Sequence, residues 1–377
     1  MRNLIYRIVD SASKIEKSEW DLIFGDIPQG YEFFKAIDES NLPGFSFHYI
    51  LIYEDKDILL IAPLFIADFN LDIAVKGISK IIIRGIREIF PRFLVLKTLF
   101  CGSPISENGV LGIRTDLKNK DVLMGELTEI MKDICNKNDI SFIVFKDFLK
   151  KDLQPLEYLK HSGFFVAESF PTVIVELGFN SLDDYFKSLG HNTRKELRHK
   201  VKKAKSTSDI EVKVADSIEN IIDEVYELYL NTYNAGNVKF EKLTKDFFIN
   251  AARYIRPQTK FFLYYLKGKI VAFNLCFAYP DLLIDEFIGF DYDISYKYNL
   301  YFFSWCYNID WCLKNSIRYY QVGQTDYHPK IRLGGRLIPL YAYVRYRNPV
   351  LNLILRLFAK FLQPTNFDED IKSNAWK

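Results

Sequence analysis

The sequence predicts a mixed α/β protein built from two domains. Its 377 residues are about twice the length of a common domain, and an apolar content of 49% is sufficient for packed cores. Short apolar runs alternate with stretches of helical periodicity, and this alternation occurs in both halves of the chain. We therefore expect an N-terminal domain at 1–168, a C-terminal domain at 169–348 and an apolar tail at 349–377.

The first half has apolar, β-branched runs on both sides of Glu54-Asp55-Lys56, which predicts a hairpin. A stretch of helical spacing then precedes a buried strand, and a glycine closes a short helix before the next strand. The predicted strands are 47–53, 57–65, 140–145 and 172–177, and the predicted helices are 122–137 and 156–163.

The second half begins with helices and continues with a three-stranded meander. Ser181 suits an N-cap, because Asp183 and Asp184 then lie in the first turn, where the helix dipole favours them. Lys267-Gly268 and Tyr279-Pro280-Asp281 are the turns of the meander. The predicted helices are 182–189, 192–205, 218–234, 300–315 and 349–362, and the predicted strands are 260–265, 269–277, 282–290, 317–322 and 339–346.

Charge and cysteine usage narrow the classes of function. The 50 Lys and Arg residues nearly balance the 48 Asp and Glu residues, so the net charge of +2 does not indicate a polyanionic partner. The five cysteines form no CxxC motif and no Cys/His pair has zinc-ligand spacing, so we expect neither a disulfide scaffold nor a metal. With no signal-peptide pattern and no bilayer-length apolar run, we expect a cytoplasmic protein, either soluble or held at the inner membrane face.

Four motifs follow one another in the second half. Tyr185 and Leu189 precede an R-x-x-L-R pattern formed by Arg194, Leu197 and Arg198. The other three are Gly289-Phe290-Asp291 at the end of the meander, YYQVG at 319–323, and Lys330 followed by Gly334.

These motifs and the order of elements resemble the Gcn5-related N-acyltransferase (GNAT) fold. The first half looks like a more degenerate copy, and the tandem arrangement resembles the FemAB-like, peptidoglycan-biosynthesis-like branch, from about Trp20 to Tyr346. The sequence departs from that branch at three positions. Gln321 stands where an acidic residue is common, and Pro329 and Leu333 stand where aromatic residues are common.

The resemblance implies an acyl donor bound beside the meander, with its pyrophosphate at the N-terminus of the following helix. The equivalent turn, residues 295–300, has no glycine, whereas coenzyme A enzymes of the superfamily favour glycine there. Coenzyme A binding is therefore in doubt, and some FemAB-like members use aminoacyl-tRNA instead. Lys297, Tyr298 and Asn299 are the candidate donor contacts, although Lys297 also fits a solvated loop lysine.

Five side chains are candidates for the chemistry. By resemblance, Lys330 steadies negative charge on the donor phosphate or on the reacting carbonyl, and it follows a strand end, where ligand crevices form. The alternative is a surface lysine. Asp285 and Glu286 interrupt an apolar strand, and alternation predicts one on each face. Either could accept the amine proton or pair with a helix-borne arginine. Tyr327 and His328 are alternative proton carriers.

Basic segments indicate further partners. Arg194 and Arg198 share a helical face, which fits a solvated helix, contact with an anionic donor or tRNA, or an anionic membrane surface. Residues 76–90 place four basic residues opposite four isoleucines, and the apolar tail 349–362 carries Arg356 and Lys360. Both segments fit either peripheral membrane contact or helices that cover a core. The basic residues of the first segment are Lys76, Lys80, Arg84 and Arg87, and the isoleucines are Ile78, Ile82, Ile86 and Ile89.

The resulting hypothesis is an N-acyltransferase of cell-envelope biogenesis, with its site in the second domain. It transfers an acyl or aminoacyl group from acyl-CoA, aminoacyl-tRNA or acyl-carrier protein to a primary amine of an envelope, polysaccharide or lipid-linked precursor. Direct attack is expected, because no Cys or Ser stands in a nucleophile motif. The alternatives are a non-catalytic GNAT-fold binding protein and a membrane-face acyltransferase acting on a long-chain amine.

Overall fold

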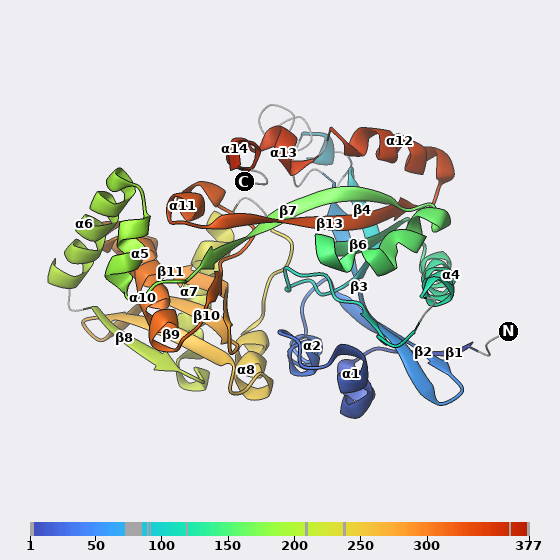
Figure 1. The fold of residues 1–377 in the computed structure, drawn as a ribbon, viewed down its shortest axis with the longest axis horizontal. Helices are drawn as coiled ribbons and strands as arrows, with labels where there is room; N and C mark the ends of the chain where they lie inside the picture. Colours follow the sequence, from blue (N-terminus) through green and yellow to red (C-terminus); the bar gives the residue numbers. More distant parts are fainter. Residues whose placement is uncertain are drawn as a thin grey trace. The chain divides into compact units, whose positions relative to one another are not determined.

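The computed structural model describes residues 4–71, 85–88, 90, 92–117, 120–207, 210–236, 239–361 and 363–374, and it contains two compact units (Figure 1). Unit 1 comprises the chain up to Asp38, Pro43–Pro171 and the chain from Pro339 onward. Unit 2 comprises Glu39–Leu42 and Thr172–Ile338. The predicted mixed α/β class is confirmed, but the units are not two consecutive segments of the chain. Residues 339–346, which we expected in the second domain, belong to unit 1 because they pair with β6.

The sheet of unit 1 has the order β1-β2-β3-β4-β6-β13, with β5 paired to β3. The β4/β6 pair is parallel and the other neighbours are antiparallel. The predicted hairpin is present, with Glu54 opposite Asp57. The strands are β1 (Leu4–Val9), β2 (Ser46–Glu54), β3 (Asp57–Asn70), β4 (Val95–Cys101), β5 (Gly112–Ile113), β6 (Phe142–Leu149) and β13 (Arg336–Tyr346).

One long helix covers this sheet. Leu127 and Met131 of α4 are fully buried in a core shared with Leu60, Leu99 and Phe145. The segment predicted as a short helix at 156–163 is a 3-10 helix, Gln154–Ser162, closed by left-handed Gly163. The α-helices of unit 1 are α1 (Lys17–Phe24), α2 (Tyr31–Asp38), α4 (Asp121–Lys137), α12 (Pro349–Ala359), α13 (Pro364–Phe367) and α14 (Glu369–Asn374), with short 3-10 turns at Ala12–Lys14 and Lys150–Asp152. The predicted basic helix at 76–90 lies largely outside the described residues; only 85–88 and 90 of it are described.

The sheet of unit 2 has the order β7-β12-β11-β10-β9-β8, and only its β11/β12 pair is parallel. The predicted meander is present within two residues at each end. The strands are β7 (Phe165–Glu176), which begins in unit 1, β8 (Ile210–Ala215), β9 (Thr259–Leu266), β10 (Lys269–Ala278), β11 (Leu282–Phe290) and β12 (Tyr319–Gln321).

Helices cover both faces of this sheet. On one face, the rings of Phe273 and Phe287 contact aromatic residues of α8 and α7. On the other, Phe262 and Tyr264 of β9 contact aromatic residues of α10, which packs against α5 and α6. The helices are α5 (Leu182–Ser188), α6 (His191–Thr207), α7 (Ile222–Ala235), α8 (Lys245–Tyr254), α9 (Tyr292–Tyr298), α10 (Leu300–Lys314) and α11 (Tyr327–Arg332), with a 3-10 turn at Glu219–Ile221 before α7.

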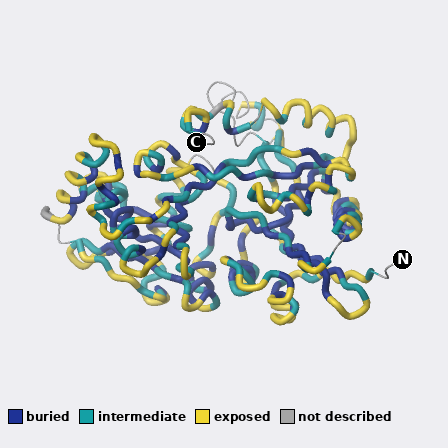
Figure 2. Tube along the Cα trace, in the orientation of Figure 1, coloured by how far each residue is buried: buried dark blue, intermediate teal, exposed yellow. Residues whose placement is uncertain are grey.

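Burial follows this layering. In Figure 2 the buried trace follows the strands of each unit, whereas α12 is exposed along most of its length.

The predicted turn at 295–300 is wrong: Asp291 caps helix α9, and only left-handed Asn299 separates α9 from α10. Asparagine tolerates this conformation, so the break needs no glycine.

Candidate functional site

The candidate site begins where β11 and β12 separate. The two strands pair over only three positions, from Leu282 opposite Tyr319 to Ile284 opposite Gln321. β11 then continues alone to Phe290, while the chain after β12 turns through left-handed Gly323 into α11. Asp285 and Glu286 are the first residues of β11 beyond the last pair. Parallel strands that part in this way leave backbone and side chains free to receive a ligand at their carboxyl ends.

A β-bulge occurs at the same point. The register passes from Leu275 opposite Phe287 to Cys276 opposite Asp285, so Glu286 is an extra residue without a partner on β10. A bulge interrupts strict alternation, so alternation alone does not place both carboxylates of this strand. Bulges are frequent beside active sites, where they redirect a side chain.

Asp285 is held by an array of neutral donors on the α10 face of the sheet. Its carboxylate accepts from Nδ2 of Asn274 at 2.9 Å to each oxygen, from the Tyr320 hydroxyl at 2.6 Å, and from Nδ2 of Asn308 at 3.2 Å. The Cys276 thiol lies 3.5 Å from Oδ1. Within the described residues, Asp285 forms no salt bridge with an arginine. The neutral donors therefore take the place of the helix-borne arginine that the sequence analysis considered as its partner.

Burial raises the pKa of Asp285 above its usual value, because it penalises the charged form. The hydrogen bonds from Tyr320, Asn274 and Cys276, and the charge of Lys330, oppose this shift without cancelling it. The raised pKa makes the carboxylate a better proton acceptor than an exposed aspartate.

Lys330 lies in α11, and only 8% of its surface is exposed. This is not the exposure of a solvated surface lysine. The glycines after it are explained by backbone geometry: Gly334 has φ +89°, and a Cβ on Gly335 would lie 2.8 Å from the Lys330 carbonyl oxygen and 2.5 Å from Val173. The 330–335 segment therefore requires glycine to close against β7.

The remaining candidates in this region differ in exposure. Tyr327 is buried, Glu286 is partly buried and His328 is exposed. Tyr301 in α10 was missed by the sequence reasoning. Its hydroxyl is buried and has no hydrogen-bond partner within the described residues. Burial raises its pKa, and the charges of Asp326 and Asp285 add to the shift. Nothing in the aromatic-rich sequence of α10 distinguishes Tyr301 from its neighbours.

The proposed donor contacts lie at the α9–α10 junction. Lys297 is exposed and its Nζ lies 5.3 Å from the ring centroid of Tyr298. Asn299 is left-handed, and α10 begins without a side-chain cap on its first backbone N–H groups. An uncapped helix N-terminus carries partial positive charge and can accept an anion.

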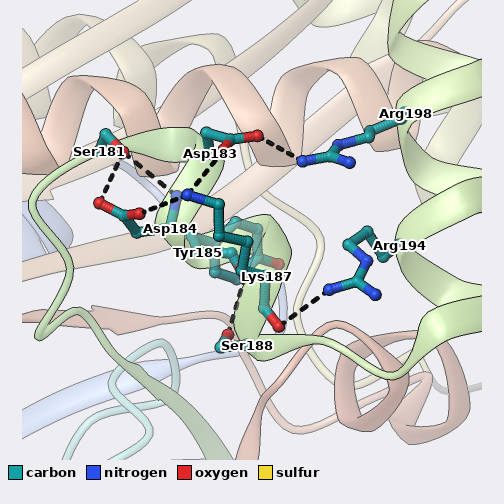
Figure 3. A network of polar contacts seen from close by, with 8 residues as sticks. All are labelled: Ser181, Asp183, Asp184, Tyr185, Lys187, Ser188, Arg194 and Arg198. Atoms are coloured by element: carbon teal, nitrogen blue, oxygen red, sulfur yellow. Dashed lines mark hydrogen bonds and ion pairs between the residues drawn. The ribbon is translucent and has the colours of Figure 1, made fainter.

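Arg194 and Arg198 both connect α6 to α5 (Figure 3). Arg194 donates to the Lys187 carbonyl oxygen at 3.2 Å, and Arg198 forms an ion pair with Asp183. Lys187 also pairs with Asp183 at 3.0 Å. On the inner side of α6, Leu197 is buried, so the helix packs by one face and presents its basic residues on the other.

Two of the sequence motifs meet in space. The Tyr185 hydroxyl, from the first motif, donates to the Leu333 carbonyl oxygen at 2.8 Å, next to Gly334 of the last motif. Glu196 pairs with Arg332 at 2.6 Å, and both line a small pocket between α6, α10 and α11. The R-x-x-L-R and Lys330 segments thus form one continuous surface within unit 2.

Comparison with known families identifies the chain. Residues 11–372 match the FemAB-like family, described as peptidoglycan biosynthesis/recognition. The chain belongs to the FemAB-like family. This membership supports a transferase connected with cell-envelope precursors. No curated protein matches the sequence.

Solved structures agree on the fold. FemX aligns with a TM-score of 0.54 and 13% identity, over 92% of this chain and 99% of its own. A tandem GNAT protein from the clavulanic acid biosynthesis pathway aligns with a TM-score of 0.54 and 10% identity, over 92% and 99%. L-PGS from Bacillus licheniformis aligns with a TM-score of 0.53 and 11% identity, over 93% and 98%. The predicted fold of two GNAT-like domains is confirmed by these likenesses.

Other features concern the described residues only. Among them, no helix is long and apolar enough to span a membrane, and no group of His, Cys, Asp and Glu side chains is arranged to hold a metal. All five cysteines are buried and none forms a disulfide.

Proposed function

We propose that the protein transfers an acyl or aminoacyl group to a primary amine of a cell-envelope precursor, and that the reaction takes place in unit 2 where β11 and β12 separate. The observation that carries this proposal is the buried Lys330, whose charge acts on the partly buried Asp285 beside the β11 bulge. Acyl transfer to an amine needs a proton acceptor and a group that stabilises the developing oxyanion, and a carboxylate of raised pKa and a buried cation fit these two roles.

The reaction is a direct displacement. The amine nitrogen attacks the carbonyl carbon of the donor, a C–N bond forms, and the C–S or C–O bond to the carrier breaks. Asp285 accepts the amine proton directly or through a water molecule, and the departing thiolate or alkoxide takes up that proton from the same carboxyl group, which returns Asp285 to its carboxylate form. Lys330 stabilises the negative charge that develops on the carbonyl oxygen. Tyr327, buried in the same helix, is the alternative proton carrier, ahead of exposed His328.

The donor carrier binds at the α9–α10 junction. Lys297, Tyr298 and Asn299 border the first turn of α10, and Arg194 and Arg198 lie along the basic face of α6. An aminoacyl-tRNA would use this basic face, because phosphates along its backbone need several cations. Acyl-CoA or acyl-carrier protein would use the α10 N-terminus alone.

The acceptor is an amine-bearing precursor, either a small molecule or one linked to a lipid carrier. The described residues of unit 1 include an exposed apolar helix, α12, which supports a peripheral position at the inner membrane face. An acceptor embedded in the membrane would then be within reach of the protein.

Product formation with amine acceptors tests the reaction. Purified protein is incubated with acyl-CoA, acyl-carrier protein or charged tRNA and amine-bearing envelope precursors, and products are detected by mass spectrometry. We expect Lys330→Met to lower kcat/KM by about a hundredfold or more, as for other donors to a developing oxyanion. Lys314→Met, an exposed lysine of α10, is the matched control and should leave the rate unchanged. Equal rates for the two variants would remove Lys330 from the mechanism.

Thermal stabilisation distinguishes the candidate acyl donors from one another. Binding to the native state raises the unfolding temperature, and the rise grows with the logarithm of the ligand concentration relative to Kd. Stabilisation by a coenzyme A ester identifies the thioester route, and its absence together with salt-sensitive tRNA binding identifies aminoacyl transfer.

The second candidate is a non-catalytic binding protein. It is favoured by Gln321, which stands where relatives commonly carry an acidic residue, and by the several donors that already occupy the Asp285 carboxylate. Precursor binding that persists in Lys330→Met and Asp285→Asn, without product from the unaltered protein, would select this function.

A further inference from the structure

Helix α12 carries an apolar face that no described residue covers. Large side chains on roughly half of its circumference are exposed, from 42% for Ile354 to 65% for Val350, and Phe361 just beyond the helix is 73% exposed. Arg356 and Lys360 border this face, and residues 347–363 contain three basic residues and no acidic one. The exposed apolar side chains are Val350, Leu351, Leu353, Ile354, Leu357, Phe358 and Phe361.

The orientation of α12 is fixed by its polar side. Asn348 caps the helix by accepting from the backbone of Val350 at 3.0 Å. Asn352 accepts from the Tyr346 backbone at 2.8 Å and donates to the Gly163 carbonyl oxygen at 2.9 Å. These bonds turn Asn352 toward unit 1, so the apolar face points away from it.

A basic pocket lies beside the first turn of α12. It encloses about 340 Å³, its open mouth included, and Arg345, Arg347 and Lys132 line it. Arg347 lies two residues before the helix, and Arg345 Nε lies 3.6 Å from where a Cβ on Gly163 would be, next to the carbonyl that Asn352 binds. The pocket residue Arg345 and the helix residue Asn352 therefore both lie beside the backbone of Gly163.

The three cations of the pocket are not equivalent. Lys132 pairs with Glu129 at 2.7 Å and Arg347 pairs with Asp139 at 3.2 Å. Arg345 is partly buried, and within the described residues its guanidinium forms neither an ion pair nor a hydrogen bond. A guanidinium with five donors and no protein acceptor is suited to a bidentate anion such as a phosphate. Ser141 and Asn136 line the same pocket and add neutral polar groups.

We propose that the apolar face of α12 and the Arg345 pocket together form a docking surface for an anionic bilayer, in which α12 lies in the interface and the pocket binds the phosphate of a lipid headgroup. The charge of the segment selects this occupant over a protein, because residues 347–363, which carry the apolar face, contain three basic residues and no acidic one. Interfacial helices combine the same features, an apolar face and flanking Lys or Arg. The inference goes beyond the proposed chemistry and does not depend on any residue of unit 2.

Vesicle flotation tests this surface in the full chain. Vesicles of phosphatidylcholine alone are compared with vesicles containing equal parts of phosphatidylglycerol and phosphatidylcholine. We expect binding to the anionic vesicles that weakens with added salt. The double variant Leu353→Ser with Leu357→Ser should lower this binding more than about tenfold, because both side chains leave the interface. Leu22→Ser with Val122→Ser is the matched control, since these residues of α1 and α4 are equally exposed.

The pocket is tested separately. Arg345→Gln should lower binding to anionic vesicles about fivefold and leave the weaker binding to phosphatidylcholine unchanged. Arg7→Gln, which changes an exposed arginine of β1, is its control. Equal binding of Arg345→Gln and the unaltered protein would overturn the headgroup site.

Three further results would overturn the whole surface. The first is no vesicle binding by the unaltered protein at low salt. The second is thermal stabilisation by inorganic phosphate without vesicle binding, which would make the pocket a site for a free anion. The third is a dimer in light scattering that the α12 double variant dissociates, which would make the apolar face an interface between two copies of the chain.

Discussion

Replacement of Tyr320 by phenylalanine tests how the protein holds the Asp285 carboxylate. Tyr320 is fully buried in β12, and its hydroxyl donates to Asp285 Oδ2 at 2.6 Å while accepting from Asn308 at 3.0 Å. Asn308 keeps its own bond to Asp285 in the variant, so the change removes mainly one hydrogen bond to a charged group. Such a bond contributes about 1.5–3 kcal/mol.

The pH dependence has a definite sign. Burial raises the folded pKa of Asp285 above 3.8, and the Tyr320 hydrogen bond is the largest influence that lowers it. An aspartate with a raised folded pKa destabilises the fold as the pH rises through that value. Without Tyr320 the folded pKa of Asp285 rises further, so Tyr320→Phe should cost most at pH values above the raised pKa of the variant. The cost should shrink as the pH falls from that value to the folded pKa of the unaltered protein, and it should stay constant below that.

Urea unfolding at several pH values measures this effect. Tyr343→Phe is the matched control, because Tyr343 is equally buried but donates, at 2.7 Å, to Glu157, whose side chain is 52% exposed. Its loss should cost only about 0.5–1.5 kcal/mol. In the double variant with Asp285→Asn, the pH-dependent part of the Tyr320→Phe cost should vanish. A loss that is the same at every pH would refute the reasoning.

Three other substitutions or treatments have defined outcomes. Gly289→Ala should lower the free energy of unfolding by about 1–3 kcal/mol or more in urea titration, because a Cβ there would lie 2.3 Å from the Phe273 ring and 2.7 Å from the Leu228 backbone. An unchanged midpoint would show that α7 shifts to accommodate the Cβ at little cost. Tyr301→Phe should leave the unfolding temperature unchanged or raise it, because the Tyr301 hydroxyl has no hydrogen-bond partner within the described residues. A lower kcat in a variant that still folds would mark this hydroxyl as a substrate contact. Native protein should react slowly with a thiol reagent at neutral pH and fully in denaturant, because burial raises the pKa of every cysteine; fast labelling of the native protein would contradict the buried positions of Cys101, Cys135, Cys276, Cys306 and Cys312.

The sequence predicts well the elements whose patterns are local. The meander was located closely because its turns, including Lys267-Gly268, carry clear turn chemistry. Strand β8 was missed because it pairs only with β9 and alternates partly exposed residues, as an edge strand does. Helix α8 was missed because its short apolar pattern is capped by Thr244, a signal too weak to separate from a loop.

The candidate site depends on contacts that the sequence does not encode locally. The motif around Lys330 could be found by resemblance, but the burial of Lys330 follows from the tertiary packing of α11, which no local pattern encodes. The bulge at Glu286 depends on the register of β10, and the amide donors to Asp285 come from β10 and α10. A pattern of apolar and polar residues does not report such long-range partners.

The crossing of β13 from unit 2 into unit 1 has a consequence for biosynthesis. β13 begins at Arg336, and its part from Pro339 onward pairs with β6, which was made some two hundred residues earlier in the chain. During translation, unit 2 is available almost complete while the sheet of unit 1 still lacks its last strand. Unit 2 therefore has the opportunity to fold first, and β6 keeps an open edge until β13 has left the ribosome. A chain that terminates before Pro339 would retain that edge permanently, and such truncated chains should be prone to aggregation.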